Sequence, residues 1–271
     1  MDAAAPTTAD GPAFPATPDG DAAWSAAARA RLAEADAALA VRFDRGDDVD
    51  ALVSARAATA DGLIRDAWAR CVHGDAALFA VGGYGRGELF PQSDIDLLVL
   101  ADEAVQATQA EALARFLALL WDAALQASQA VRSPAQCTEA AADQTVLTAL
   151  MEWRALVASP ADCDALRAAI AQDRAWPAAG FFRAKVEEQR QRHARFGDTA
   201  DNLEPNLKDG PGGLRDIQTL RWMAQRVLGS GTLESMLAFG QIGAVEFDTL
   251  ERERKALSRL RFGLHLVAGR R

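Results

Sequence analysis

Apolar residues recur at helical spacing over two stretches near the start of the chain. From Ala22 to about Arg45, and from Val49 to His73, Ala, Leu, Val and Trp return every three or four positions between charged residues. This period predicts two amphipathic helices, which form an N-terminal helical segment over residues 21–75. Residues 1–20 mix Ala, Pro, Thr, Asp and Gly without such a period, so we expect a disordered tail there.

Short, continuous apolar runs replace the helical pattern after this segment. Leu78 to Val81 is stopped by two glycines, and Ile95 to Leu100 begins beside two aspartates. Runs of this length, bounded by turn residues, are typical of buried strands. A long helix is predicted to follow, from Glu103 to about Ala124.

A third strand is predicted to end at Val131-Arg132. Ser133 and Pro134 come directly afterwards and supply an N-cap and a first-turn proline for the next helix. Gly197 to Gly212 is a long loop, and loops of that length inside a helical region are more often functional than accidental. The remaining stretches have the helical pattern and predict helices over residues 134–158, 160–174, 177–197, 213–229 and 243–268.

These elements predict an α+β fold. A small mixed sheet with helices packed on it would form the core, residues 76–160, and a mostly helical extension would follow, residues 161–271, carrying the loop 198–213. Alanine dominates the apolar residues and there is one tyrosine in the sequence, which favours packed helices with a modest sheet.

Charge and cysteine content narrow the functional classes. The net charge of -9 argues against non-specific electrostatic binding to the nucleic-acid backbone, so no nucleic-acid partner is expected. The three cysteines are odd in number and form no CxxC pair, which fits a reducing cytoplasm. No stretch approaches the roughly 18 apolar residues of a membrane helix, and the first basic residue is Arg29, so neither a membrane segment nor a secretory leader is expected.

The strongest chemical signal is the segment GGYGRGELFPQSDIDLLVL, from Gly82 to Leu100. Residues i and i+2 of a strand face the same side, so Asp94 and Asp96 would project together while Ile95 points into the core. Two carboxylates roughly 7 Å apart repel each other unless a cation lies between them, and Mg²⁺ prefers such oxygen ligands. The alternative is that both aspartates are merely solvated at a strand end.

The glycines of this segment suggest contact with phosphates. Gly82 and Gly83 have no side chains, so the backbone amides of the turn could approach a triphosphate closely, and Arg86 would add a charge-assisted contact. A glycine pair after an apolar strand can also be an ordinary turn. The combination with the two aspartates favours the chemical interpretation, which is phosphoryl transfer.

A second segment, NLEPNLKDGPGGLRDIQ from Asn202 to Gln218, reads as a rigid turn before a helix. Its prolines and glycines restrict the backbone, and the helix from about Leu214 would offer free amides to an anion. Lys208 and Arg215 would add positive charge. The alternative is that Arg215 and Asp216 form structural pairs and Lys208 is solvated.

The first segment resembles the polymerase-beta nucleotidyltransferase superfamily, and its wording, GGYGRGEL then SDIDLL, resembles the PII uridylyltransferase branch. EPNLKDGPGGLRDIQ and KVEEQRQRH, residues 185–193, are also similar to that branch. The resemblance implies a polymerase-beta-like core that transfers UMP from UTP to a tyrosine of the PII nitrogen-regulatory protein, releasing pyrophosphate. It further implies Mg²⁺ on Asp94 and Asp96, and UTP contacts from residues that include the serine before them: Gly82, Gly83, Arg86, Ser93, Lys208 and Arg215.

The sequence departs from the superfamily pattern at the third carboxylate, which members often carry on a later strand. The candidate strand, Leu125 to Arg132, contains no acid. We nominate Asp143 as the third catalytic acid, with Glu152 behind it, although either residue could instead cap or salt-bridge a helix. Tyr84 could lie beside the nucleotide or serve only in packing.

Full members of that family also carry a histidine-aspartate hydrolase domain and two ligand-sensing domains of the ACT type. No His-Asp dipeptide occurs in this chain, so removal of UMP is not expected of it, and the sequence reads as a truncated transferase half. Two alternatives stay open. The chain could be a non-catalytic nucleotide-binding remnant, or it could transfer AMP from ATP to another regulatory protein.

Overall fold

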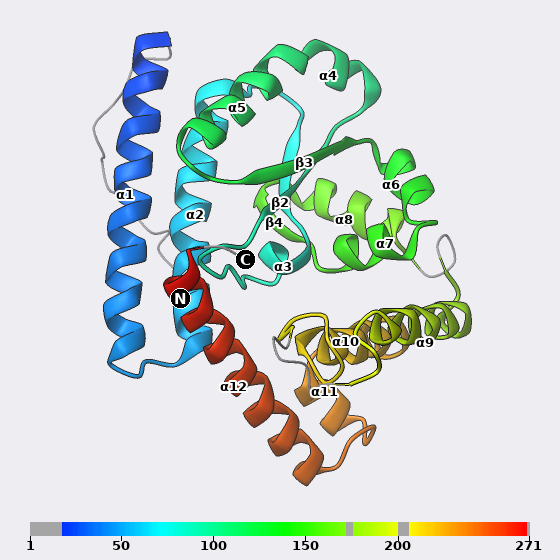
Figure 1. Ribbon diagram of the computed structural model, residues 1–271. Helices are drawn as coiled ribbons and strands as arrows, with labels where there is room; N and C mark the ends of the chain where they lie inside the picture. Colours follow the sequence, from blue (N-terminus) through cyan, green and yellow to red (C-terminus); the bar gives the residue numbers. More distant parts are fainter. Residues whose placement is uncertain (1–17, 172–175, 200–205, 270–271) are drawn as a thin grey trace, which may run out of the picture.

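A four-stranded mixed sheet lies at the centre of the molecule (Figure 1). The computed structural model describes residues 18–171, 176–199 and 206–269. β1 is antiparallel to β2 and β4, and β2 is parallel to β3. The α+β fold with a small mixed sheet is confirmed. The strands, in the spatial order β3-β2-β1-β4, are β1 Ala77–Ala80, β2 Ile95–Leu100, β3 Ala127–Arg132 and β4 Arg154–Val157.

Helices cover both faces of this sheet, because both faces of its central strands are apolar. Leu78 of β1 and Leu97 of β2 belong to one buried cluster, packed against helices from the first half of the chain. Phe79 and Leu98, which point the opposite way, belong to a second cluster with later helices. The helices on the first face are α1 Pro18–Asp44, α2 Val49–Cys71 and α5 Ala110–Asp122.

The two predicted N-terminal helices are confirmed as α1 and α2, which lie side by side (Figure 1). α1 begins at Pro18, so residues 18–20 belong to a helix and not to the predicted tail. The rest of that tail lies outside the described residues. α2 starts at Val49 because the Asp48 side chain accepts a hydrogen bond from the amide of Asp50.

Two of the predicted helices are not continuous in the structure. The stretch 103–124 is divided at Gln109 into α4 Glu103–Thr108 and α5. The stretch 134–158 contains α6 Pro134–Ala140, α7 Gln144–Met151 and then strand β4. β4 exists because its backbone pairs with β1 at the sheet edge, a tertiary contact that overrides local helical preference.

The helical extension consists of α8 to α12. α12 runs back from the extension to α2, where Phe262 stacks on Phe43 and packs against Phe90 (Figure 1). Within the part of the chain that the structure describes, no helix combines the length and apolar character needed to cross a membrane. The elements of the extension are α8 Pro160–Ala169, α9 Ala178–Ala194, α10 Leu214–Leu228, α11 Leu233–Ala238 and α12 Ala244–Ala268.

Candidate active site

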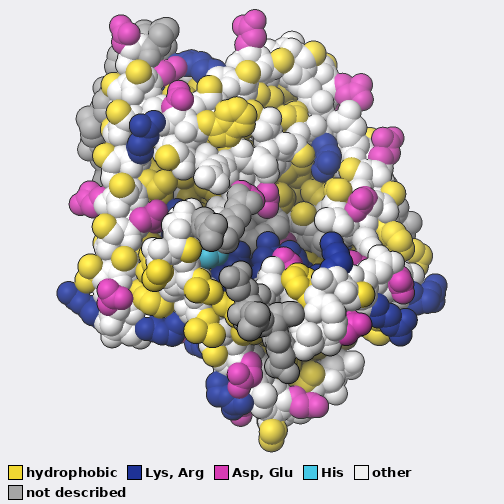
Figure 2. Space-filling model, viewed as in Figure 1, with side chains coloured by type: hydrophobic (Ala, Val, Ile, Leu, Met, Phe, Trp, Pro, Cys, Tyr) yellow, Lys and Arg dark blue, Asp and Glu magenta, His cyan; other side chains and the backbone are white. Residues whose placement is uncertain are grey.

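A polar pocket of about 260 Å³ lies where the helical extension meets the sheet. Figure 2 shows Lys and Arg side chains gathered across a hollow in this part of the surface. All the predicted site residues except Asp143 line the pocket, together with residues from α7, α10 and α12. The predicted residues that meet there are Gly82, Gly83, Arg86, Ser93, Asp94, Asp96, Lys208 and Arg215.

The glycine turn after β1 is a short helix, α3 Gly82–Gly85, wedged between β2 and α7. Gly82 has a φ of +58°, and a Cβ there would lie 3.4 Å from the Asp96 carboxylate. At Gly85 a Cβ would lie only 1.8 Å from the backbone oxygen of Glu152. Gly85, which the sequence analysis did not single out, is therefore the glycine with the least room for a side chain.

Asp96 lies on β2 and Asp94 directly precedes that strand, and both residues line the pocket. Ile95 between them is 2% exposed and belongs to the cluster on the opposite face of the sheet. The backbone oxygen of Asp96 accepts a hydrogen bond from Val81, which ties the aspartate to the glycine turn. A cation or a phosphate-bound metal that entered the pocket would therefore lie near both residues.

Ser128 occupies the place on β3 opposite Asp96. The two residues are register partners of the parallel β2–β3 pair, and the Ser128 hydroxyl donates a 2.7 Å hydrogen bond to Asp96 Oδ1. A hydroxyl thus stands where the superfamily pattern led us to look for a third carboxylate. It orients the Asp96 side chain but adds no charge.

The donor set fits Mg²⁺ bound together with a nucleotide. Among the described residues no group of three or more His, Cys, Asp or Glu side chains could hold a metal. Mg²⁺, however, is commonly held by one or two carboxylates and completes its coordination with water and substrate phosphates. Asp94 and Asp96 would be those two carboxylates if Mg²⁺ bound here.

Arg86 stabilises the glycine turn through two ion pairs. Its guanidinium donates to Glu152 at 2.6 Å and to Glu88 at 2.9 Å, and the Trp222 indole donates to Glu152 at 2.5 Å. Burial alone would lower the pKa of Arg86, but the two carboxylates raise it above its ordinary value, so Arg86 stays charged. Since its charge is already balanced, Arg86 holds α3 against α7 and α10.

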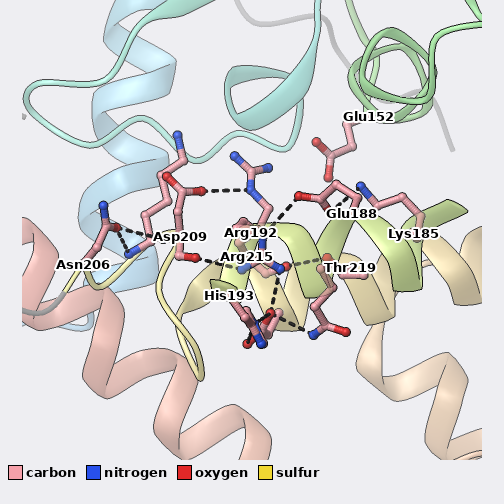
Figure 3. Close-up of polar contacts among 12 residues, drawn as sticks. Glu152, Lys185, Glu188, Arg192, His193, Asn206, Asp209, Arg215 and Thr219 are labelled. Atoms are coloured by element: carbon pink, nitrogen blue, oxygen red, sulfur yellow. Dashed lines mark hydrogen bonds and ion pairs between the residues drawn. The ribbon is translucent and has the colours of Figure 1, made fainter. Parts of the chain in front are cut away.

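The loop before α10 is folded back on its own backbone (Figure 3). The Asn206 side chain accepts hydrogen bonds from the amides of Lys208 and Asp209. The amides of Leu214 and Arg215 donate to the carbonyl oxygens of Leu207 and Lys208, at 2.9 and 2.8 Å. The prediction that this helix start offers free amides to an anion is therefore wrong. Residues 200–205 of the loop lie outside the described residues.

Asp216 fixes this loop to α9. Its carboxylate accepts hydrogen bonds from the Gly212 amide at 2.8 Å, from Arg192 at 2.7 Å and from His193 at 3.0 Å. Burial alone would raise the pKa of Asp216, but the hydrogen bonds from Arg192, Gln189 and His193 outweigh it and hold that pKa below its ordinary value. The loop therefore depends on an ionised Asp216.

We expect Asp216→Asn to lower the free energy of unfolding by about 2 kcal/mol at pH 7, because buried Arg192 loses a charged partner. A carboxyl whose folded pKa is depressed stabilises the protein above its unfolded pKa, and this contribution disappears as pH falls through the folded value. Urea unfolding should therefore show that the free energies of unfolding of the wild type and the variant converge below about pH 4.

Asp164→Asn is the control, because Asp164 forms an exposed pair with Arg167. It should change the free energy of unfolding by less than about 0.5 kcal/mol. An equal deficit at every pH would contradict the ionic role.

Three cations approach the pocket from the extension. Lys208 and Arg215 come from the loop and the start of α10, as predicted, and Arg261 comes from α12. Burial, and then the neighbouring charges of Arg215 and Arg261, hold the pKa of Lys208 below its ordinary value. Arg261 was missed because no local motif surrounds it; only the packing of α12 on the core brings it to the site.

Asp143 does not line the pocket and instead caps α7. Its exposed carboxylate accepts hydrogen bonds from the amides of Thr145, at 2.6 Å, and Val146, at 3.3 Å. The nomination of Asp143 as third catalytic acid is thus not supported by its position. Glu152 does line the pocket, but both its oxygens already accept hydrogen bonds, from Arg86 and Trp222.

Tyr84 anchors the turn to α2. Its side chain is 1% exposed, and its hydroxyl donates a 2.6 Å hydrogen bond to Asp61, which also pairs with Arg154. Burial, and then the charge of Asp61, raise the pKa of Tyr84 well above its ordinary value. The packing role considered for this residue is the one that its contacts support.

Comparisons with known proteins show which families the chain resembles. Residues 62–143 match the family described as "Nucleotidyltransferase domain", and residues 180–271 match "GlnD PII-uridylyltransferase". The chain is 59% identical, over 253 residues, to a bifunctional uridylyltransferase/uridylyl-removing enzyme of Xanthomonas campestris, covering 93% of this chain and 29% of that protein. The enzyme of the same name from Methylococcus capsulatus is 46% identical over 249 residues, 90% of this chain and 28% of that protein. The chain thus spans less than a third of the length of these relatives.

Proposed function

This chain belongs to the family of the bifunctional uridylyltransferase/uridylyl-removing enzymes, and we propose that it transfers UMP from UTP to a tyrosine of the PII nitrogen-regulatory protein, releasing pyrophosphate. The observation that carries this proposal is the pocket itself. Asp96 lines it from β2 and Asp94 from the residue before that strand, while Lys208, Arg215 and Arg261 line it from the extension. A site with carboxylates on one wall and cations on the other suits a metal-bound polyphosphate.

The chain's own residues would divide the work of binding. Mg²⁺ held by Asp94 and Asp96 would supply charge neutralisation for the phosphates and the departing pyrophosphate. The glycine turn lets the backbone approach the phosphates, because neither Gly82 nor Gly83 carries a side chain toward the pocket. Lys208 and Arg215 would offset the negative charge from the opposite wall.

Among the described residues that line the pocket, no third carboxylate is free to act as a general base. A tyrosine acceptor makes this easier to accommodate. A tyrosine hydroxyl has a pKa of about 10, far below that of an aliphatic alcohol, so its deprotonation needs less help from a general base. A site in which Ser128, and not an acid, contacts Asp96 is therefore compatible with attack by a phenol. The lack of an acid at this place would hinder transfer to a serine or threonine hydroxyl more strongly.

The test is to incubate the chain with Mg²⁺, UTP labelled on its α-phosphate, and PII protein. We expect label on a PII tyrosine, in an amount that excess unlabelled UTP suppresses and excess ATP does not. A parallel incubation uses ATP labelled on its α-phosphate, and label on the protein from ATP but not from UTP would instead favour adenylyl transfer. Saturable, Mg²⁺-dependent UTP binding without any label on PII would identify a nucleotide-binding remnant and overturn the proposed transfer.

A further inference from the structure

Arg261 is a partly buried arginine that lines the pocket. Among the described residues, the hydrogen bond that Arg261 makes runs from its Nη2 to the Ser93 hydroxyl at 3.5 Å, which is at the limit of a hydrogen bond. No carboxylate of these residues lies within ion-pair distance of it. By contrast, carboxylates pair with Arg56, Arg86, Arg154, Arg192 and Arg254.

The surroundings of Arg261 make this lack of an acidic partner costly. Its guanidinium carbon lies 4.4 Å from the ring centroid of Phe90, so the side chain is held in place against an apolar surface. Burial, which removes water from the charge, lowers the pKa of Arg261 to about 10. The negative charge of Asp209 acts in the opposite direction on this pKa, but Asp209 pairs with Arg215 at 3.3 Å, and Lys208 and Arg215 bring further positive charge to the pocket. A fixed cation among cations is unfavourable until an anion enters.

We propose that Arg261 of α12 is a phosphate-binding residue of the nucleotide site, which together with Lys208 and Arg215 holds the polyphosphate of the nucleoside triphosphate opposite Asp94 and Asp96. This inference rests on the proposed function and assigns to it a residue far along the chain from the glycine turn. A guanidinium that packs against an aromatic ring keeps its donor edge free for phosphate oxygens.

The contact with Ser93 adds a positioning consequence. Ser93 directly precedes Asp94, and the ring of His265, one turn further along α12, accepts a hydrogen bond from the amide of Gln92 at 3.3 Å. α12 therefore touches the segment that leads into the two aspartates at two neighbouring points. A phosphate bound by Arg261 would lie beside the carboxylates that hold the metal.

The test compares Arg261→Met with Arg259→Met. Met keeps an apolar stem against Phe90 and removes the charge. Arg259 lies on the same helix but donates to the backbone oxygens of Asp47 and Phe43, away from the pocket. Binding of UTP, UMP and inorganic tripolyphosphate is measured by calorimetry in the presence of Mg²⁺.

We expect Arg261→Met to weaken binding of UTP and tripolyphosphate about 10- to 100-fold, the loss typical of a charge-assisted hydrogen bond, and to leave UMP binding within about twofold. Arg259→Met should bind all three as the wild type does. Unchanged UTP and tripolyphosphate binding in Arg261→Met overturns the inference, as does an equal loss for UMP. If Arg261→Met is insoluble, Arg261→Gln carries the same expectations.

The transfer reaction and the phosphate-binding role of Arg261 can be refuted independently of each other. A wild-type chain that binds UTP and tripolyphosphate, is weakened by Arg261→Met, and labels no PII protein would refute the transfer reaction and keep the phosphate site. A chain that labels PII protein with a KM for UTP unaffected by Arg261→Met would keep the reaction and refute the role of Arg261.

Discussion

Replacing Asp96 with asparagine should abolish nucleotidyl transfer without lowering the melting temperature. Asn keeps the shape of the side chain and still accepts the hydrogen bond from Ser128, but it removes a carboxylate from the proposed metal site. Several kcal/mol of charge stabilisation in the transition state would be lost, which corresponds to a roughly thousandfold or greater fall in kcat/KM. In the metal-free protein the change relieves repulsion between neighbouring carboxylates, so stability should hold or rise.

Asp143→Asn is the matched control for this experiment. Asparagine is as good an N-cap as aspartate, so α7 should keep its start, and the residue lies outside the pocket. Initial rates with labelled UTP, and thermal melts with and without Mg²⁺, would be compared for the two variants. Loss of both activity and stability in Asp96→Asn would assign Asp96 a structural role, and strong loss of activity in Asp143→Asn would restore it as a catalytic acid.

Gly85→Ala should be the most destabilising single-methyl change among the glycines of the turn. The new Cβ would meet the backbone oxygen of Glu152 at 1.8 Å and the backbone oxygen of Ala80 at 3.0 Å, and neither atom can rotate away. α3 would have to separate from the end of α7, which we expect to cost about 3 kcal/mol or more. Differential scanning calorimetry should show a fall in melting temperature of roughly 6 to 12 °C.

Gly62→Ala provides the opposite expectation in the same protein. Gly62 is exposed within α2 and nothing lies within 4 Å of the position of its Cβ. Alanine there should raise stability by up to about 1 kcal/mol, because it restricts the unfolded chain and favours the helix. A Gly85→Ala variant as stable as wild type would mean that α3 and α7 are not packed as tightly as described.

The features that sequence reasoning placed correctly are those fixed by local geometry. The alternation of a strand puts Asp94 and Asp96 on one side whatever packs against it, and a glycine pair after an apolar run ends that strand. Strand β4 could not be found in this way, because its four residues are extended only through pairing with β1. The preference of its sequence for a helix is real but weaker than that pairing.

The rest of the site depends on contacts between distant segments. The amides at the start of α10 appeared available because the sequence does not reveal that the loop folds back on them. Arg261 reaches the pocket only because α12 packs on α2, more than 160 residues from the glycine turn in the chain. A local motif marks the two aspartates of the proposed metal site, whereas the cations of the pocket are brought together by tertiary structure.

The burial of Tyr84 keeps the tyrosine of this sequence away from the proposed reaction. An enzyme that modifies tyrosines faces the hazard that it consumes nucleotide on itself. This chain contains a single tyrosine, Tyr84. It lies within the glycine turn, is 1% exposed and donates its hydroxyl hydrogen to Asp61. The single phenol of this sequence is therefore kept from the proposed reaction, and the acceptor tyrosine must come from outside these 271 residues.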